Sequence, residues 1–153
     1  MPPLEKFFHV EILPGSDINT ALNNSYKEDS SECLCTVCNS VNKHIISRTI
    51  FDHPRVLLVL VKRYANSSSY ARSTRDCRKV LVGNTLDILG QKYTLGGCVV
   101  HRGASVNKGH YISCVMIQGQ WYVCNDSSIQ KVRSLPDESR DAYLLFFIKH
   151  QSA

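Results

Sequence analysis

The sequence lacks an apolar segment long enough to cross a membrane. Its longest uninterrupted apolar run, residues 56–61, is far shorter than the roughly 20 residues that a membrane-spanning helix needs. The N-terminal residues also lack the basic stretch, apolar stretch and small-residue cleavage site of a secretory leader. We therefore expect a protein that has no membrane partner.

Evenly paired cysteines are missing as well. The chain contains seven cysteines, an odd number, and most of them stand in apolar or metal-like surroundings. A disulfide framework would instead require an even number at regular spacing. The cysteines thus indicate reduced thiols and a location in the cytosol, the nucleus or both.

Long runs of one charge sign and low-complexity tracts do not occur. The net charge is +5, and the positive residues are dispersed except around residues 65–78. That segment is rich in Ser, Asn and Arg, so it cannot fill a core, and it carries no nucleic-acid-binding motif. It predicts an exposed connection and no nucleic-acid partner.

What the chain does contain predicts one moderate core in a mainly antiparallel α+β fold. Its 153 residues are 43% hydrophobic, enough for one domain or a large piece of one. Short apolar segments separated by Gly, Asn, Ser and Pro are typical of an antiparallel sheet with few helices. The expected strands are residues 7–13, 56–61, 80–82, 93–102, 109–117, 120–125 and 142–148.

Two local patterns add detail to this fold. Ser16 or Asp17 is expected to cap a helix that follows Pro14-Gly15. The continuous apolar run at residues 56–61 predicts a central strand that is covered on both faces.

The candidate functional site lies on the hairpin formed by residues 109–117 and 120–125. His110 stands near the start of the first strand, and Asn125 and Asp126 end the second. A histidine with an amide or carboxylate beside it is the base and orienter of a thiol hydrolase. Gly109 keeps the approach to this histidine open.

Which side chain faces His110 depends on the loop at residues 118–120. A two-residue loop places Asn125 on the face of His110, whereas a three-residue loop selects Asp126. Because two-residue loops containing Gly are the commoner hairpin connection, we favour Asn125. The chosen side chain would accept the ring N–H and leave the other ring nitrogen to deprotonate a thiol.

Five segments of the chain resemble successive blocks of the ubiquitin-specific protease family, in the same order and with fitting spacing. Together they extend over nearly the whole chain, and they are far more specific than a single short motif. They are Pro54–Tyr64, Val99–Gly103, Gly109–Ser113, Trp121–Asp126 and Ala142–Phe147.

The resemblance implies a papain-like fold of fingers, palm and thumb that cleaves isopeptide bonds after the C-terminal glycine of ubiquitin. It implies that His110 is the general base, Asn125 its orienter and Asp126 an adjacent acidic residue that assists. It further implies that Gly103, in the loop of residues 102–108, and Gly109 and Tyr111 border the ubiquitin tail. Ubiquitin or ubiquitinated proteins are then the expected partners.

The chain departs from this family pattern in one respect. The family carries its nucleophilic cysteine in a Thr-Cys-containing box of the thumb, and no such box occurs in residues 1–153. We expect none of Cys77, Cys98, Cys114 and Cys124 to replace it, since none sits at a helix N-terminus that would lower its pKa. The expected unit is a single partial catalytic domain with the thumb absent. It divides into fingers and palm over about 7–64, a loop over 65–79, and a palm with the histidine box over 80–149.

Cys35 and Cys38 form a CxxC pair, which is half of a zinc knuckle. Structural zinc needs four ligands, and no second CxxC is present. Cys33, His44 or His53 could complete the site in principle, but we favour a free or weakly occupied half site. Catalysis of the expected kind requires no cofactor.

Two functions follow from these observations. In the first, the chain is the histidine-bearing half of a thiol-dependent deubiquitinase and is inactive without a complementing thumb segment. In the second, it is an inactive remnant that binds ubiquitin or another partner. We favour the first, because a relaxed remnant would have no physical need for His110 with an aligned amide.

Overall fold

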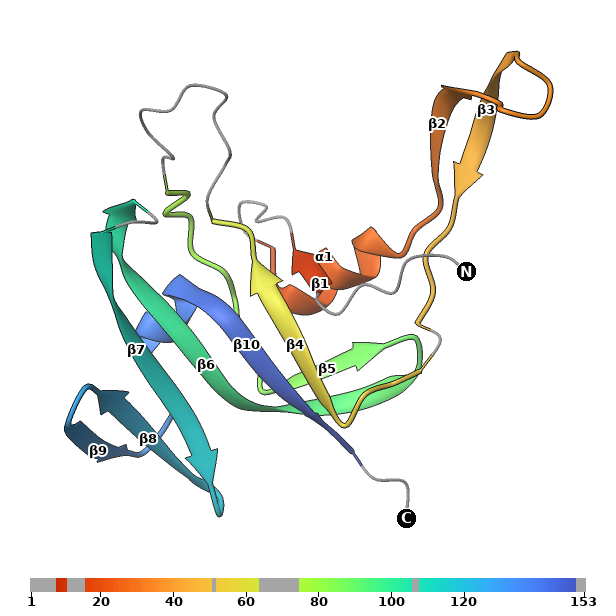
Figure 1. Cartoon of the computed structure of the whole chain (residues 1–153). Coiled ribbons are helices and arrows are strands. Elements are labelled where there is room, and N and C mark those ends of the chain that lie inside the picture. The colour runs from red at the N-terminus through yellow and green to blue at the C-terminus, as the bar shows by residue number, and fades with distance from the viewer. Residues whose placement is uncertain (1–7, 11–15, 51, 64–74, 106–107, 151–153) are drawn as a thin grey trace.

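The structure, a computed structural model, describes residues 8–10, 16–50, 52–63, 75–105 and 108–150. Within these residues, one large sheet forms the body of the molecule (Figure 1). Its strands are β1 (Phe8–Val10), β4 (Val56–Val61), β5 (Thr85–Ile88), β6 (Gln91–Ser105), β7 (Lys108–Ile117), β8 (Gln120–Asn125), β9 (Ser128–Val132) and β10 (Ala142–Lys149).

The strands follow the order β1-β4-β10-β6-β7-β8-β9, and β5 pairs with β6 beside this path. The β1–β4 pair is parallel, and the other pairs of this sheet are antiparallel. The predicted mainly antiparallel α+β fold is therefore confirmed. The expected strand over residues 7–13 is described only at β1, and its remaining residues lie outside the described part.

The one α-helix of the described residues is α1 (Ile18–Ser25). Of the two predicted caps, Asp17 is used: its Oδ1 accepts the Thr20 backbone N–H at 2.7 Å. Ile18 and Leu22 are buried against the sheet, so the helix covers part of one sheet face. No helix among the described residues is long and apolar enough to cross a membrane.

Strand β4 is not central, which corrects the prediction made from its apolar run. It lies between β1 and β10, next to the sheet edge. Leu57, Val59 and Val61 are buried on the face that α1 covers, while Leu58 and Leu60 on the other face are only half-buried. Side-chain alternation along the strand produces this difference, because the described elements cover only one of its faces.

The strand expected over residues 80–82 is also wrong. Leu81 makes a single bridge with Asp17, and its carbonyl oxygen accepts the Ile18 N–H at 3.1 Å. The Val80 N–H donates to the Arg140 carbonyl oxygen at 3.2 Å. These backbone groups are thus used to fix the helix start and the 3₁₀ helix η1 (Asp137–Asp141) instead of a ladder.

A separate two-stranded hairpin projects away from the body of the molecule (Figure 1). It consists of β2 (Asp29–Leu34) and β3 (Val41–Ile46), and every side chain of β2 is exposed. The CxxC pair stands in the turn between these strands. In Figure 1 this hairpin and the β8–β9 end of the sheet lie on opposite sides of the molecule.

A buried arginine ties the end of β4 to two distant segments. Arg63 is 1% exposed, and its guanidinium donates to the carbonyl oxygens of Asp76, Arg78, Arg140 and Ala142 at 2.6–3.0 Å. Burial lowers the pKa of Arg63 below its usual value. The four carbonyl groups thus take the place of water around a desolvated cation.

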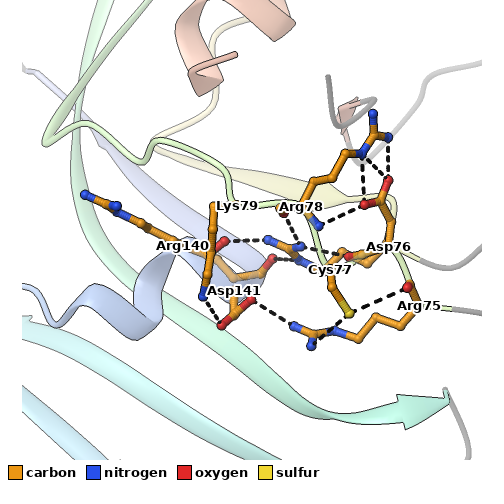
Figure 2. A network of polar contacts seen from close by, with 9 residues as sticks. Arg75, Asp76, Cys77, Arg78, Lys79, Arg140 and Asp141 are labelled. Carbon is orange, nitrogen blue, oxygen red and sulfur yellow. Dashed lines mark hydrogen bonds and ion pairs between the residues drawn. The ribbon is translucent and has the colours of Figure 1, made fainter. Parts of the chain in front are cut away.

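Ion pairs surround this arginine on the side of η1. Asp141 lies between Lys79 and Arg75, at 2.8 Å and 3.2 Å, and Asp76 pairs with Arg78 (Figure 2). The network therefore fixes the segment 75–79, which the sequence predicted to be part of an exposed loop. The rest of that predicted loop, residues 65–74, lies outside the described residues.

Candidate active site

The site is built on the hairpin of β7 and β8, whose turn contains two residues. Ile117 pairs with Gln120, so Gln118 and Gly119 form the connection, and both have positive φ, +48° and +78°. Two positive φ angles are what a type I′ turn requires, and glycine adopts them without strain. The two-residue alternative is therefore the one that the structure has.

This register places Asn125 on the same face as His110. The Oδ1 atom of Asn125 lies 2.5 Å from Nε2 of His110. Because a carbonyl oxygen only accepts, Nε2 carries the proton in this contact, and Nδ1 is left as the acceptor. The His110 side chain is 46% exposed, so a second molecule can reach the ring.

Asp126 stands further from the ring than Asn125 does. Its Oδ2 lies 3.9 Å from Nε2 of His110, and its side chain is 81% exposed. Asp126 follows β8 in the turn to β9 and has a φ of +50°, a conformation that Asp tolerates better than most residues. An ion pair at this distance exists only while the imidazole is protonated.

Two of the three residues predicted to border the ubiquitin tail, Gly103 and Gly109, lie at one irregularity in the β6–β7 ladder. Arg102 pairs with His110 and Ser105 pairs with Lys108, so two residues of β6 stand opposite Gly109 alone. This is a β-bulge directly beside the histidine, a common device next to active sites. Gly103 is one of the two bulged residues.

Tyr111, the third predicted tail residue, follows His110 and is 51% exposed. Its ring packs against the ring of His101 in a tilted arrangement, with ring centroids 4.5 Å apart. The sequence did not single out His101, although it lies within the block 99–103 that carries the family resemblance. Its position in the ladder, directly opposite Tyr111, is what reveals it.

A cavity of about 190 Å³ lies on the sheet face that carries Asn125. Its polar lining near the histidine consists of Arg102 and Asn125. The lining residues are Val100, Arg102, Ile112, Cys114, Val123, Asn125, Ser128 and Gln130.

None of the cysteines makes a described contact with His110. Cys114 is four residues further along β7, roughly 13 Å at the rise of a strand, and it pairs with Cys98. Cys124 pairs with Ser113 and thus points to the opposite face of the sheet from His110. Cys77 contacts Arg75, and the remaining three cysteines lie in the projecting hairpin.

The thiols of Cys98 and Cys114 are both buried, and the hydrogen bond between them together with burial raises the pKa of Cys98 well above its usual value. A raised pKa opposes thiolate formation, so Cys98 lacks the character of a nucleophile.

The CxxC pair forms a compact turn at the tip of the hairpin. The Cys35 N–H donates to the Ser40 carbonyl oxygen at 2.9 Å, and Sγ of Cys38 lies 2.9 Å from Oγ of Ser40. Hydrogen bonds from the Ser40 side chain and backbone and from Cys35 lower the pKa of Cys38 to about 7. Such thiols suit a metal, but the described residues hold no group of three or more side chains that could bind one. By themselves they do not fit a four-ligand zinc site.

The sequence matches the profile of a known family, described as Ubiquitin carboxyl-terminal hydrolase, over residues 16–147. The chain belongs to this family. The predicted membership among ubiquitin-specific proteases is confirmed, and so is the papain-like fold class.

Relatives in the family resemble the chain over most of its length. Ubiquitin carboxyl-terminal hydrolase 25 of Arabidopsis thaliana is 30% identical over 94% of this chain and 21% of its own length. Ubiquitin carboxyl-terminal hydrolase 8 of Saccharomyces cerevisiae is 30% identical over 76% of this chain and 28% of its own length. The chain therefore spans about a quarter of the length of these relatives.

Solved structures in the family agree. A structure of the yeast SAGA DUB module superposes with a TM-score of 0.74 and 25% identity, over 95% of this chain and 35% of the matched chain. A SAGA DUB module of Ubp8, Sgf11, Sus1 and Sgf73 bound to ubiquitin aldehyde gives a TM-score of 0.70 at 23% identity, over 95% and 36%. The sheet that carries His110 is thus arranged as in these enzymes.

Proposed function

We propose that this chain is the histidine-bearing part of a thiol-dependent deubiquitinase, which hydrolyses isopeptide or amide bonds at the C-terminus of ubiquitin. The observation that carries the proposal is the 2.5 Å contact between His110 Nε2 and Asn125 Oδ1. It supplies a base and its orienter on two neighbouring, hydrogen-bonded strands. Family membership and the ubiquitin aldehyde bound by the similar SAGA DUB module support ubiquitin as the substrate.

The chemistry assigned to the chain is proton transfer. Asn125 accepts the Nε2 proton of His110 and thereby holds the ring in the tautomer whose Nδ1 lone pair can accept the proton of a thiol. The resulting imidazolium then returns the proton to the departing amine. Asp126, at 3.9 Å, would stabilise the imidazolium by its charge.

The attacking thiol would come from outside the seven cysteines of this chain. None of them contacts His110 in the described residues, and a base needs its nucleophile within hydrogen-bond reach. A complementing thumb segment that carries a cysteine is therefore the proposed partner. The cytosol or the nucleus, where thiols stay reduced, is the proposed location.

Complementation tests this function. The purified chain is mixed with a segment of a family member that carries the reactive cysteine, and hydrolysis of a fluorophore linked to the ubiquitin C-terminus is followed. We expect no turnover by the chain alone, turnover by the mixture, and a loss of roughly 10²- to 10⁴-fold on His110→Ala. Equal activity of the His110→Ala mixture would overturn the assignment.

A second candidate function is ubiquitin binding without hydrolysis. The observation that favours it is the absence of a cysteine contact to His110 among the described residues. Calorimetric titration of the chain alone with ubiquitin distinguishes the two functions. Saturable binding together with a failure of every complementing segment to restore hydrolysis would favour the second function.

A further inference from the structure

The two histidines of the β6–β7 hairpin point to opposite faces of the sheet. His110 lies on the face of Asn125, whereas His101 pairs with Tyr111 and shares the face of Gly103 and Gly109. His101 is 1% exposed, and its ring packs against that of Tyr111 with an angle of 39° between the ring planes. A buried imidazole thus lies directly behind the strand segment that carries His110.

The ring of His101 occupies the space that a side chain at Gly109 would need. A Cβ added to Gly109 would lie 2.6 Å from Cε1 of His101, even closer to its Nε2, and 2.7 Å from the Arg102 carbonyl oxygen. Real Cβ atoms essentially never approach other heavy atoms so closely. Gly109 is therefore required by the packing of His101, in addition to any role toward a ubiquitin tail.

A side chain at Gly103, on strand β6, would be excluded in the same way. A Cβ at Gly103 would lie 2.8 Å from the Cα of Gly109 and 3.1 Å from Cε1 of His101. The two glycines therefore let the strands close at the bulge while the imidazole of His101 packs across both. Burial and the charge of Arg75 lower the pKa of His101, which favours the neutral ring in this layer.

We propose that His101 is a positioning residue for His110: its ring packs on the bare backbone of Gly103 and Gly109 and fixes where β7 presents the His110 imidazole to Asn125. Gly109 immediately precedes His110, so a shift of its backbone moves the Cα of His110 directly. The 2.5 Å contact has little tolerance, because hydrogen bonds weaken steeply with distance and angle. The importance of this positioning for catalysis rests on the proposed function, whereas the packing of His101 on the two glycines does not.

The test reads the His110 ring itself in the full chain, without substrate. Long-range ¹H–¹⁵N spectra report whether Nε2 carries the proton, and Asn125→Ala gives the spectrum of the broken contact. We expect His101→Ala and Gly109→Ala each to move the His110 signals at least halfway toward that spectrum. His53→Ala is the matched control, because His53 also lies beside a tyrosine: its ring centroid is 6.4 Å from that of Tyr93. Loss of the His53 ring should leave the His110 signals in place.

Two further variants keep the test decisive. His101→Asn retains a planar polar group, and we expect it to restore at least half of the displacement caused by His101→Ala. In the double variant of His101→Ala and Gly109→Ala, the added methyl group no longer meets the ring and only the clash with the Arg102 carbonyl oxygen remains. The displacement that Gly109→Ala adds to that of His101→Ala should therefore be clearly smaller than the displacement caused by Gly109→Ala alone.

Unmoved His110 signals in a folded His101→Ala chain would overturn the proposal, and so would additive effects in the double variant. If the Gly109→Ala chain does not fold, the comparison of the His110 signals in His101→Ala and His101→Asn decides whether the proposal holds. Because these spectra need no turnover, failure here is distinguishable from failure of the proposed hydrolase function, which the complementation assay measures.

Discussion

The Nε atom of Arg63 donates to the carbonyl oxygen of Ala142 at 2.7 Å, joining the end of β4 to the start of β10 across 79 residues of sequence. The same guanidinium binds three further carbonyl oxygens, so a single side chain closes the sheet at this corner.

Replacing Arg63 with Met should destabilise the fold strongly. The substitution removes the guanidinium donor from four carbonyl groups, of which that of Arg140 keeps the Val80 N–H, and we expect a loss of about 3 kcal/mol or more in the free energy of unfolding. Arg63→Lys should recover only part of it, because an ammonium lacks the planar fork. Urea unfolding measures the effect, with Lys62→Met, an exposed neighbouring cation, as the control expected within about 0.5 kcal/mol of the unaltered chain. A loss for Arg63→Met no larger than for this control would contradict the role.

Asp141 should contribute stability that depends on pH. Burial alone would raise its pKa, but the hydrogen bond and charge of Lys79 and the charge of Arg75 hold the pKa below its usual value. A lowered folded-state pKa gives a contribution that is fully present above about pH 4 and is lost as the pH falls through the lowered value.

The measurement compares Asp141→Asn with the unaltered chain at several pH values. We expect a cost of about 1 kcal/mol at pH 7 that disappears in strong acid. Glu28→Gln, an exposed carboxyl substitution, is the control and should show no such change. If Asp141→Asn still lowers the free energy of unfolding by the same amount at pH 2, the charge of Asp141 is not what stabilises the fold.

The two polar residues beside His110 should differ in their effect on turnover in the complementation assay. Asn125→Ala removes the 2.5 Å contact, so we expect a loss of about ten- to a hundredfold, smaller than that of His110→Ala. Asp126→Gly removes a charge at 3.9 Å and suits the positive φ, so turnover should fall less than tenfold with unchanged stability. A larger loss for Asp126→Gly than for Asn125→Ala would reverse the assignment of the orienter.

Purified chain should contain well below one zinc ion per molecule. Cys35 and Cys38 supply two ligands, and structural zinc needs four. Elemental analysis by mass spectrometry gives the ratio directly. Stoichiometric zinc that is lost in Cys35→Ser and retained in Cys33→Ser would prove the half-site interpretation wrong.

Local patterns in the sequence predicted much of the fold and of the site. The alternation of β7 and β8 and the glycine at position 119 limited the partner of His110 to Asn125 or Asp126, because a strand turns alternate side chains to the same face. Asp17 was recognised as a candidate cap from its residue type, since a cap acts within three residues of itself.

The places where sequence reasoning failed depend on distant contacts. The run at residues 56–61 predicted a strand covered on both faces, but its position beside β1 and β10 leaves one face half-buried. Residues 80–82 have the composition of a strand, but their backbone groups bind the starts of α1 and η1. Composition alone cannot report which partner a backbone group finds.

The sequence by itself determined the class of fold, the family and the pair of strands that bear His110, because these follow from local periodicity and from motifs in a fixed order. Only the tertiary structure decided that Asn125 contacts the His110 ring, that Arg63 joins three segments and that His101 packs on Gly109. These relationships depend on strand register and on the bulge between β6 and β7, where close approach of the backbones sets which side chains can fit.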